Sequence, residues 1–421
     1  MAPKNQREFA EQVVRRLHEA GHTAYWAGGC VRDELIGRTP HDYDVATDAH
    51  PQQVRRLFGH RRTLAVGIAF GVVVILGPPG AGQIEVATFR SDCEYLDGRR
   101  PEGVAFSSPQ EDAKRRDFTV NGLFYDPIES RVIDFVGGQD DLRAGIIRAI
   151  GNPIDRFTED KLRLLRAVRF ATTFGFSIEP ATREAVGRMA SQVTVVSCER
   201  IADEMQRMLT LPGRAAAVRL LIDTGLADAV LPELVSADTE TSSNLERTLD
   251  VLGRLDPVTF PLALAALLAD RLAPEAIRNV CRRWRLSNDT TDRAEWLAKH
   301  RRTLCDAPSM RWSALQKTLI SPGIEELLCW NEAEAAVDGR STEPVDYCRQ
   351  RLAVPRDQLD PEPLVTGDDL TAHGLTPGPL FGELLARLRD AQLDGEIHTR
   401  RQGLAMVDQM VHDRNKNGPA V

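Results

Sequence analysis

The spacing of apolar residues changes once along this chain, close to Gly145. Upstream of this point, short runs rich in β-branched and aromatic residues alternate with turn residues and short helical segments. Downstream, almost every segment repeats its apolar residues with the spacing of an α-helix. This change predicts an α+β protein, in which an N-terminal domain with a mixed β-sheet is followed by all-α domains.

We expect the sheet to follow a helix over 8–20, which ends at Gly21, a residue type common just after helices. The expected strands are 23–27, 42–46, 70–76, 83–89, 118–126 and 131–136. A continuous helix is predicted through 158–170. The later helices are expected at 181–190, 198–210, 214–224, 245–254, 260–271, 274–285, 313–319, 324–337, 379–393 and 399–412.

At 421 residues the chain is too long for one compact core. We expect four domains, which cover 1–145, 146–215, 216–345 and 346–421. The stretch 338–363 is rich in Pro and Asp, so it is predicted to be a linker before the last domain. The last seven residues are expected to be frayed.

Composition narrows the class of protein without naming its function. Hydrophobic residues make up 42% and charged residues 27%, as in ordinary globular proteins, and no segment has the length of a membrane span. The seven cysteines are widely spaced and form no C-x-x-C motif, so we expect reduced thiols in a cytoplasmic protein. The net charge of −8 does not exclude nucleic acid, because local basic surfaces decide phosphate contact.

Two aspartates, Asp42 and Asp44, are separated by one residue in a β-like run, so their side chains are predicted to point to the same face of the sheet. Two close carboxylates repel each other, and a divalent cation relieves that repulsion. Mg²⁺ accepts one or two carboxylates together with water and substrate phosphates. By itself the pair also fits an exposed polar loop, so the metal site depends on what surrounds it.

A glycine pair precedes these aspartates. Gly28 and Gly29 follow the first strand and lead into a short helix, an arrangement that offers backbone N–H groups to a triphosphate. Arg32 adds a charged donor for phosphate oxygens. A tight turn without a ligand is the alternative reading of the glycines. Glu85, on another expected strand, is either a third acid for two-metal phosphoryl transfer or part of a salt bridge on an edge strand.

Three further motifs extend this pattern: RRDFTVNGLFYD at 115–126, TEDKLRLLRAVRF at 158–170 and SCERIADEMQRML at 197–209. Together with GGCVRDELIG and HDYDVAT, they make the chain resemble the family of class II tRNA nucleotidyltransferases and bacterial poly(A) polymerases. Enzymes of this family extend an RNA 3′ end from nucleoside triphosphates without a nucleic-acid template. The resemblance implies a nucleotidyltransferase head, a neck that selects the nucleotide, a body and a tRNA-binding tail, in the four ranges given above.

The resemblance assigns roles to particular residues. It makes Asp42 and Asp44 the Mg²⁺ ligands, and it makes the glycine pair and Arg32 contacts of the triphosphate. Arg116 would meet the nucleotide, while Asp117 and Asn121 would shape the ribose pocket. One departure is Gly122, where the family usually has alanine; we expect only a local backbone effect.

The resemblance also assigns Asp160 and Arg163 to base recognition, with Arg166 and Arg169 supporting the pocket or the phosphates. A carboxylate only accepts and a guanidinium only donates hydrogen bonds. Cytosine and adenine both present an amine beside an acceptor nitrogen, whereas uracil and guanine present the opposite order. A pair that accepts at one atom and donates at the next would therefore admit C and A and reject U and G. Without a nucleotide, the same two residues fit an i,i+3 ion pair on a solvated helix.

Four other regions carry weaker expectations. The resemblance implies a mobile loop over 91–112 and a bracing helix over 197–209 that uses Glu199, Arg200 and Glu204; an amphipathic neck helix is the alternative. The segment 244–275 is reminiscent of an HD phosphohydrolase but has Ala269-Asp270 in place of His-Asp, so we expect a packing role without metal. The stretch 364–407 resembles the tail of tRNA-acting relatives.

The sequence therefore predicts a tRNA nucleotidyltransferase that adds C and A from CTP and ATP to tRNA 3′ ends. No membrane and no obligate protein partner are expected. Enzymes that add only CC or only A, and a poly(A) polymerase of the same fold, are the alternatives within the family. A noncatalytic RNA-binding protein is the alternative from another class.

Overall fold

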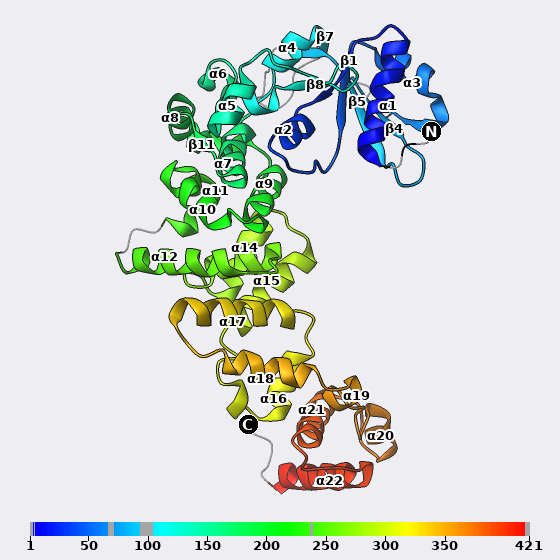
Figure 1. The fold of residues 1–421 in the computed structure, drawn as a ribbon. Coiled ribbons are helices and arrows are strands. Elements are labelled where there is room, and N and C mark those ends of the chain that lie inside the picture. Colours follow the sequence, from blue (N-terminus) through cyan, green and yellow to red (C-terminus); the bar gives the residue numbers. More distant parts are fainter. Residues whose placement is uncertain (1–2, 4, 66–70, 93–103, 236–238, 417–421) are drawn as a thin grey trace. The chain divides into compact units, whose positions relative to one another are not determined.

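The computed structural model of the chain describes residues 3, 5–65, 71–92, 104–235 and 239–416 (Figure 1). The chain divides into two compact units. The first comprises Met1–Asp238 and Arg283–Leu286, and the second comprises Thr239–Arg282 and Ser287–Val421. The predicted fold class is confirmed, because a mixed sheet at the N-terminus precedes an almost entirely helical remainder. The finer division into four domains stays a prediction.

A seven-stranded sheet forms the core of the N-terminal part, with the strand order β3-β4-β5-β2-β1-β8-β9. Its strands are β1 (Ala24–Ala27), β2 (Asp44–Thr47), β3 (Thr63–Leu64), β4 (Val72–Leu76), β5 (Gln83–Thr88), β8 (Phe124–Asp126) and β9 (Arg131–Ile133). Only β2 and β5 are parallel to each other, and all other neighbours are antiparallel. A separate two-stranded sheet is formed by β6 (Arg90–Asp92) and β7 (Val104–Phe106), which lie between β5 and β8 in the sequence.

Helix α1 (Gln6–Glu19) packs on β1, β2 and β5. Its start is capped by the side chain of Asn5, and its apolar stripe, which includes Phe9, Val13 and Leu17, is buried. Two shorter helices, α2 (Gly29–Leu35) and α3 (Pro51–Phe58), follow β1 and β2. The expected helix over 8–20 is thus confirmed, and its buried stripe packs on the sheet.

Three expected strands differ clearly from their predicted bounds. The strand predicted over 131–136 ends at Ile133. Strand β2 begins at Asp44, so Asp42 lies outside it. The run 118–126 is a strand only in its last three residues, because Thr119–Asn121 form a 3₁₀ turn, η3. The side chain of Asp117 accepts the N–H of Phe118 at 2.8 Å, a local bond that competes with strand pairing.

The predicted continuous helix through 158–170 is wrong. Helix α6 (Pro153–Glu159) ends before Asp160, and α7 (Leu162–Phe174) begins two residues later. Asp160 is extended, with φ −144°, and its side chain accepts the N–H of Leu162 at 3.0 Å. An aspartate that satisfies a free N–H in this way favours a helix start over a helix interior.

The rest of the first unit is mainly helical, apart from a short parallel pair of strands, β10 (Ile146–Ile147) and β11 (Ser177–Ile178). It contains α4 (Pro109–Lys114), α5 (Gly138–Ala144), α8 (Pro180–Met189), α9 (Cys198–Thr210), α10 (Arg214–Asp223) and α11 (Leu226–Val230). Helix α7 packs against both α9 and α10. The buried apolar stripe of α7 includes Leu165 and Val168, as the spacing predicts.

The second unit contains only helices among its described residues. Its longer helices are α12 (Thr239–Arg254), α13 (Phe260–Leu268), α14 (Pro274–Arg283), α15 (Asn288–His300), α16 (Trp312–Leu319), α17 (Ile324–Asp338), α21 (Pro379–Leu393) and α22 (Arg400–Lys416). Helix α13 is apolar on all sides and buried, and it contacts α12, α15 and α17. None of the helices in the described ranges is both long and apolar enough to cross a bilayer.

Two predictions for this unit are wrong. The expected linker 338–363 contains helices α18 (Glu343–Leu352) and α19 (Arg356–Leu359), because Val345, Cys348 and Leu359 are buried. Helix α15 was not expected, although Ser287 caps its start by accepting the N–H of Thr290. The last five residues of the stretch expected to be frayed, 417–421, lie outside the described residues.

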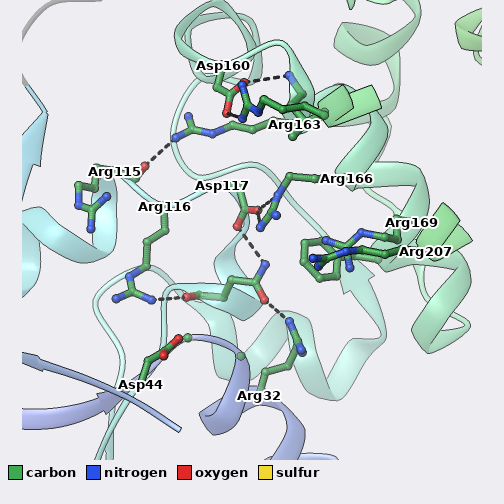
Figure 2. A pocket seen from close by; sticks show the side chains of 16 residues that line it. Arg32, Asp44, Arg115, Arg116, Asp117, Asp160, Arg163, Arg166, Arg169 and Arg207 are labelled. Atoms are coloured by element: carbon green, nitrogen blue, oxygen red, sulfur yellow. Dashed lines mark hydrogen bonds and ion pairs between the residues drawn. The ribbon is translucent and has the colours of Figure 1, made fainter. Parts of the chain in front are cut away.

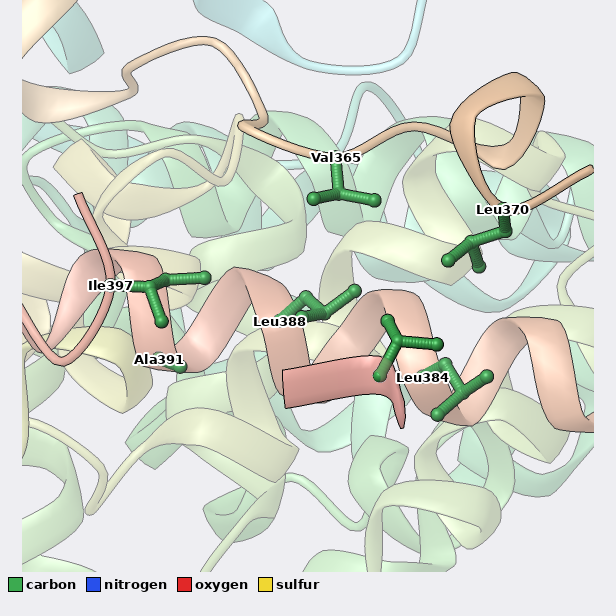
Figure 3. Close-up of a cluster of buried hydrophobic side chains, with 7 residues drawn as sticks. Val365, Leu370, Leu384, Leu388, Ala391 and Ile397 are labelled. Carbon is green, nitrogen blue, oxygen red and sulfur yellow. The ribbon is translucent and has the colours of Figure 1, made fainter. Parts of the chain in front are cut away.

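The tail of the second unit has its own apolar cluster (Figure 3). It consists of Val365, Leu370, Leu384, Leu388, Ala391, Ile397 and Val407. In the HD-like segment, Asp270 belongs to an ionic cluster. Asp270 accepts hydrogen bonds from Arg301 at 2.6 Å and from Thr248 at 2.9 Å, and Arg301 also binds Glu334 at 2.6 Å. Both oxygens of the Asp270 carboxylate therefore already accept hydrogen bonds from other side chains of the protein.

Gly122 follows η3, and neighbouring side chains leave little space there for a larger residue. Its φ of −86° is open to any residue, but an added Cβ would lie 2.6 Å from Cγ2 of Val136. We predict that Gly122→Ala lowers the free energy of unfolding by about 1–3 kcal/mol through overpacking. Denaturant unfolding measures the change. In a Val136→Ala background the same substitution should cost little, and an equal cost in both backgrounds would contradict this explanation.

Candidate active site

A cavity of about 570 Å³ opens in the first unit, next to the start of β2 (Figure 2). It is lined by Gly28, Gly29, Arg32, Asp44, Arg115, Arg116, Asp117, Asn121, Asp160, Leu162, Arg163, Arg166, Arg169, Phe170, Arg200 and Arg207. All ten residues predicted to bind nucleotide are in this set, together with Asp44. The other two predicted catalytic residues, Asp42 and Glu85, are outside it.

The glycine turn brings the backbone close to the cavity. Gly28 has φ +73°, a conformation that favours glycine, and a Cβ on it would lie 2.6 Å from Nη1 of Arg116, so that guanidinium would have to move. Arg32 is almost fully buried and donates through Nη1 to Oδ1 of Asn121 at 2.5 Å. Its guanidinium also stacks on Phe174, 4.4 Å from the ring centre.

Asp44 carries the strongest sign of charge repulsion in the cavity. Asp44 is exposed to solvent. Partial desolvation, together with the negative charges of Asp42 and Glu85, still raises the pKa of Asp44 to about 6. Arg116 acts in the opposite direction. The parallel register pairs Asp44 with Glu85, so both side chains point to the same face of the sheet. Repulsion of this kind would be relieved by a cation placed between the carboxylates.

The three acids do not form a closed metal cage. Within the residues that the structure describes, no three carboxylate, imidazole or thiol groups are arranged to hold a metal ion together. The side chain of Asp42 is 71% exposed, ahead of the strand that begins at Asp44. For Glu85, the edge-strand alternative is wrong because β5 lies between β4 and β2 inside the sheet. Its role as a third ligand stays a prediction.

Tyr43, between the two aspartates, anchors their loop. Its ring is buried against Trp26, and its hydroxyl donates to Glu34 at 2.6 Å. Burial, together with the hydrogen bond to Glu34 and the charge on that residue, raises the pKa of Tyr43 above its usual range. Arg7 of α1 donates to the same carboxylate at 2.8 Å. This network connects α1, α2 and the loop that carries Asp42 and Asp44.

A buried carboxylate, Asp117, lies at the centre of the cavity wall. Two nitrogens of Arg166 reach its Oδ2 at 2.8 and 2.6 Å, and Asn121 donates to its Oδ1 at 2.9 Å. Burial alone would raise its pKa, but Arg166 and these hydrogen bonds outweigh burial and lower the pKa of Asp117 to about 2. Through Asn121 the network continues to Arg32 (Figure 2).

Asp160 and Arg163 line the same cavity but do not bind each other. Oδ2 of Asp160 accepts from Arg200 at 2.8 Å. Arg163 donates to Glu159 at 2.7 Å and to the carbonyl oxygen of Arg115 at 3.0 Å. The i,i+3 ion pair on a solvated helix is therefore wrong, because the chain breaks its helix at Asp160.

Helix α9 supports this arrangement from the neck. Arg200 holds Asp160, and Glu204 accepts from Arg169 at 2.5 Å, so two of the three expected bracing residues contact the cavity wall. Glu199 pairs instead with Arg285 at 2.7 Å. Sequence reasoning missed Arg207, although it follows Arg200 by seven positions and so lies on the same helix face. The expected mobile loop, 91–112, falls mainly on 93–103, outside the described residues.

Three family models match this chain in order. They are described as "Poly A polymerase head domain" (24–148), "Probable RNA and SrmB-binding site of polymerase A" (175–238) and tRNA nucleotidyltransferase domain 2 (262–407). A CCA-adding enzyme of Geobacillus kaustophilus is 36% identical over 415 residues, which cover 97% of this chain and 98% of the relative. The chain belongs to the CCA-adding enzyme family. A relative from Bacillus subtilis, also named CCA-adding enzyme, is 34% identical over 93% of this chain and 94% of its own length.

Solved structures of the CCA-adding enzyme family agree with this assignment. The Bacillus stearothermophilus CCA-adding enzyme in complex with CTP is 31% identical, with a TM-score of 0.76, and covers 99% of this chain and 100% of that one. The Thermotoga maritima CCA-adding enzyme complexed with tRNA shares the fold, with a TM-score of 0.63 at 20% identity over 96% of this chain and 95% of that one. The resemblance seen in the sequence is therefore confirmed.

The anchor of the aspartate loop gives a testable prediction. Tyr43→Phe removes the hydrogen bond to Glu34 and should lower the free energy of unfolding by about 1.5–3 kcal/mol, the range for a hydrogen bond to a charged group. Denaturant unfolding measures this change. Tyr125→Phe is the matched control, since that ring also packs on Trp26 and its hydroxyl has no hydrogen bond within the described ranges. Equal losses in both variants would show that the bond to Glu34 contributes nothing.

The buried Asp117 predicts a pH dependence of stability. Its folded pKa of about 2 lies below the unfolded value of about 3.9, so its stabilisation is complete above about pH 5 and is lost as pH falls toward 2. The stability advantage of the unmodified chain over Asp117→Asn should therefore shrink by roughly 2 kcal/mol between pH 4 and pH 2. Urea unfolding of both proteins at stepped pH measures it, and a constant difference would contradict the assigned ion pair.

Proposed function

We propose that this chain adds C and A to the 3′ end of tRNA, taking CTP and ATP as substrates and releasing pyrophosphate. The terminal RNA hydroxyl attacks the α-phosphate, a new phosphodiester bond forms, and the bond to the β-phosphate oxygen breaks. One observation carries the proposal. Asp44, whose carboxylate is repelled by the charge of Asp42, lines a cavity that also holds an acceptor, Asp160, and a donor, Arg163.

Asp42 and Asp44 are proposed to hold Mg²⁺. Desolvation and then the charges of Asp42 and Glu85 raise the pKa of Asp44. A positive charge between the carboxylates would relieve the repulsive part of this effect, which supports their fit to a cation. Their number also fits, since Mg²⁺ takes one or two carboxylates and completes its shell with water and phosphate oxygens. When bound, the metal lowers the pKa of the attacking hydroxyl and neutralises charge on the leaving pyrophosphate.

The triphosphate is proposed to lie against Gly28, Gly29 and Arg32. A side chain on Gly28 would fill this space, and Arg32 is held rigidly by Asn121 and by stacking on Phe174. Because the Arg32 guanidinium is already oriented, it loses less conformational entropy when it binds phosphate. Next to it, Asp117 and Asn121 present a fixed acceptor and amide toward the ribose, and Arg116 lies across from them.

Base choice is proposed to depend on Asp160 and Arg163. Arg200 fixes the carboxylate of Asp160 without using all of its acceptor sites, and Nε of Arg163 has no partner among the described residues. One acceptor and one donor therefore remain for a base edge. U or G would leave both groups unpaired in a partly buried site, which costs about 1–3 kcal/mol per group.

We place the reaction in the cytoplasm. The six cysteines within the described ranges are free thiols, and burial raises the pKa of Cys281 and Cys348 to about 11. Unreactive, unpaired thiols are typical of proteins that work in a reducing compartment.

The test is extension of three tRNA transcripts, which end before CCA, after C and after CC, with each triphosphate supplied separately. The unmodified chain with Mg²⁺ should add C to the first two and A to the third. Asp44→Asn should abolish addition to all three. Asp160→Ala should accept U or G at least 10-fold better relative to C and A while its dependence on Mg²⁺ stays the same.

The outcomes separate the alternatives. Addition of only C or only A would identify a partial enzyme, and long runs of A would identify a poly(A) polymerase. No incorporation with any transcript would favour a noncatalytic RNA-binding protein. Unchanged discrimination in Asp160→Ala would remove the base-reading role of that residue but leave the activity standing.

A further inference from the structure

Eight arginines line the cavity, and seven of them have a carboxylate partner (Figure 2). The partners are Asp33 for Arg32, Asp112 for both Arg115 and Arg116, Glu159 for Arg163, Asp117 for Arg166, Glu204 for Arg169 and Asp160 for Arg200. These ion pairs hold the guanidinium groups in fixed positions. They also cancel most of the positive charge that the cavity would otherwise carry.

Arg207 is the exception. It has no ion pair or hydrogen bond with any residue that the structure describes. Two acids at helical spacing could pair with it, Asp203 four positions before it and Glu204 three positions before it. Glu204 instead accepts from Arg169 at 2.5 Å and lies 3.7 Å from Arg166. A positive charge with acids available nearby is thus left uncompensated at the cavity.

Arg207 lies in a different part of the cavity from Asp44, one of the residues proposed to hold Mg²⁺. It projects from α9 in the neck, next to Arg169, and is open to solvent. Burial and the nearby charges of Arg166 and Arg207 lower the pKa of Arg169, which confirms that the guanidinium groups are close. Asp44 and Arg116 lie on the other side of the cavity (Figure 2).

An exposed, unpaired guanidinium fits a phosphate, which it binds through charge-assisted hydrogen bonds. The phosphates of the incoming nucleotide would lie beside Asp42 and Asp44, because a metal held by these carboxylates would neutralise phosphate charge. The remaining phosphates in the reaction belong to the RNA backbone. We propose that Arg207 binds a backbone phosphate of the RNA strand whose 3′ end enters the cavity.

This inference rests on the proposed function, and its test separates the two. Arg207→Ala should weaken binding of a tRNA transcript about 10-fold, measured as Kd by fluorescence anisotropy without nucleotide. The slope of log Kd against log salt concentration should fall by about 0.7–0.9, the value for one lost phosphate contact. KM for CTP should stay unchanged. Arg207→Lys should recover part of the affinity, because it restores the charge without the planar donors.

The matched control is Arg188→Ala, which removes one exposed arginine from α8, outside the cavity. It should leave Kd for tRNA unchanged, and thermal unfolding should show that all variants remain folded. Equal effects of both alanine variants, an unchanged Kd in Arg207→Ala, or a rise only in KM for CTP would each overturn the proposal. Failure of the unmodified chain to extend tRNA would overturn the proposed function alone, since the binding measurement still tests Arg207.

Discussion

The buried ion pair between Asp117 and Arg166 is the interaction on which the site depends. Asp117 belongs to the segment that enters the 3₁₀ turn η3 beside the sheet, and Arg166 belongs to α7, the first long helix after it. Through Asn121 the same network reaches Arg32, behind the glycine turn. One network therefore connects the residues proposed to hold the triphosphate and the ribose. A buried pair of this kind contributes little net stability but specifies geometry strongly, because separating its charges is costly.

Two opposite electrostatic arrangements meet in the cavity. Around Asp44 like charges are held together, which raises its pKa to about 6 and works against folding at neutral pH. Elsewhere in the cavity, Asp and Glu side chains of the protein neutralise seven arginines. Both arrangements prepare the site for its reactants. Unrelieved repulsion favours the binding of a cation, and paired guanidinium groups stay in position without attracting every anion in solution.

Much of this could be predicted from the sequence. Gly28, Gly29, Asp42 and Asp44 form a compact motif, and every residue predicted to bind nucleotide lines one cavity. The errors concern local competition that periodicity does not reveal. Asp160 ends a helix because its carboxylate satisfies the N–H of Leu162, and the stretch 338–363 folds into helices because a few apolar residues in it find a core. Gly122 reads as a backbone feature, but it is a packing constraint set by Val136, which lies fourteen residues further along.

The sequence by itself determined the α+β class, the family and the chemical types of the site residues. These properties follow from spacing and from short motifs, which are local along the chain. The tertiary structure alone decided which charges neutralise which. Asp160 binds Arg200, forty residues away, and not Arg163. Glu204 binds Arg169, and Arg207 has no partner among the described residues. Ion pairing depends on distances of a few ångströms between side chains, and spacing in sequence does not specify these distances once the chain has folded.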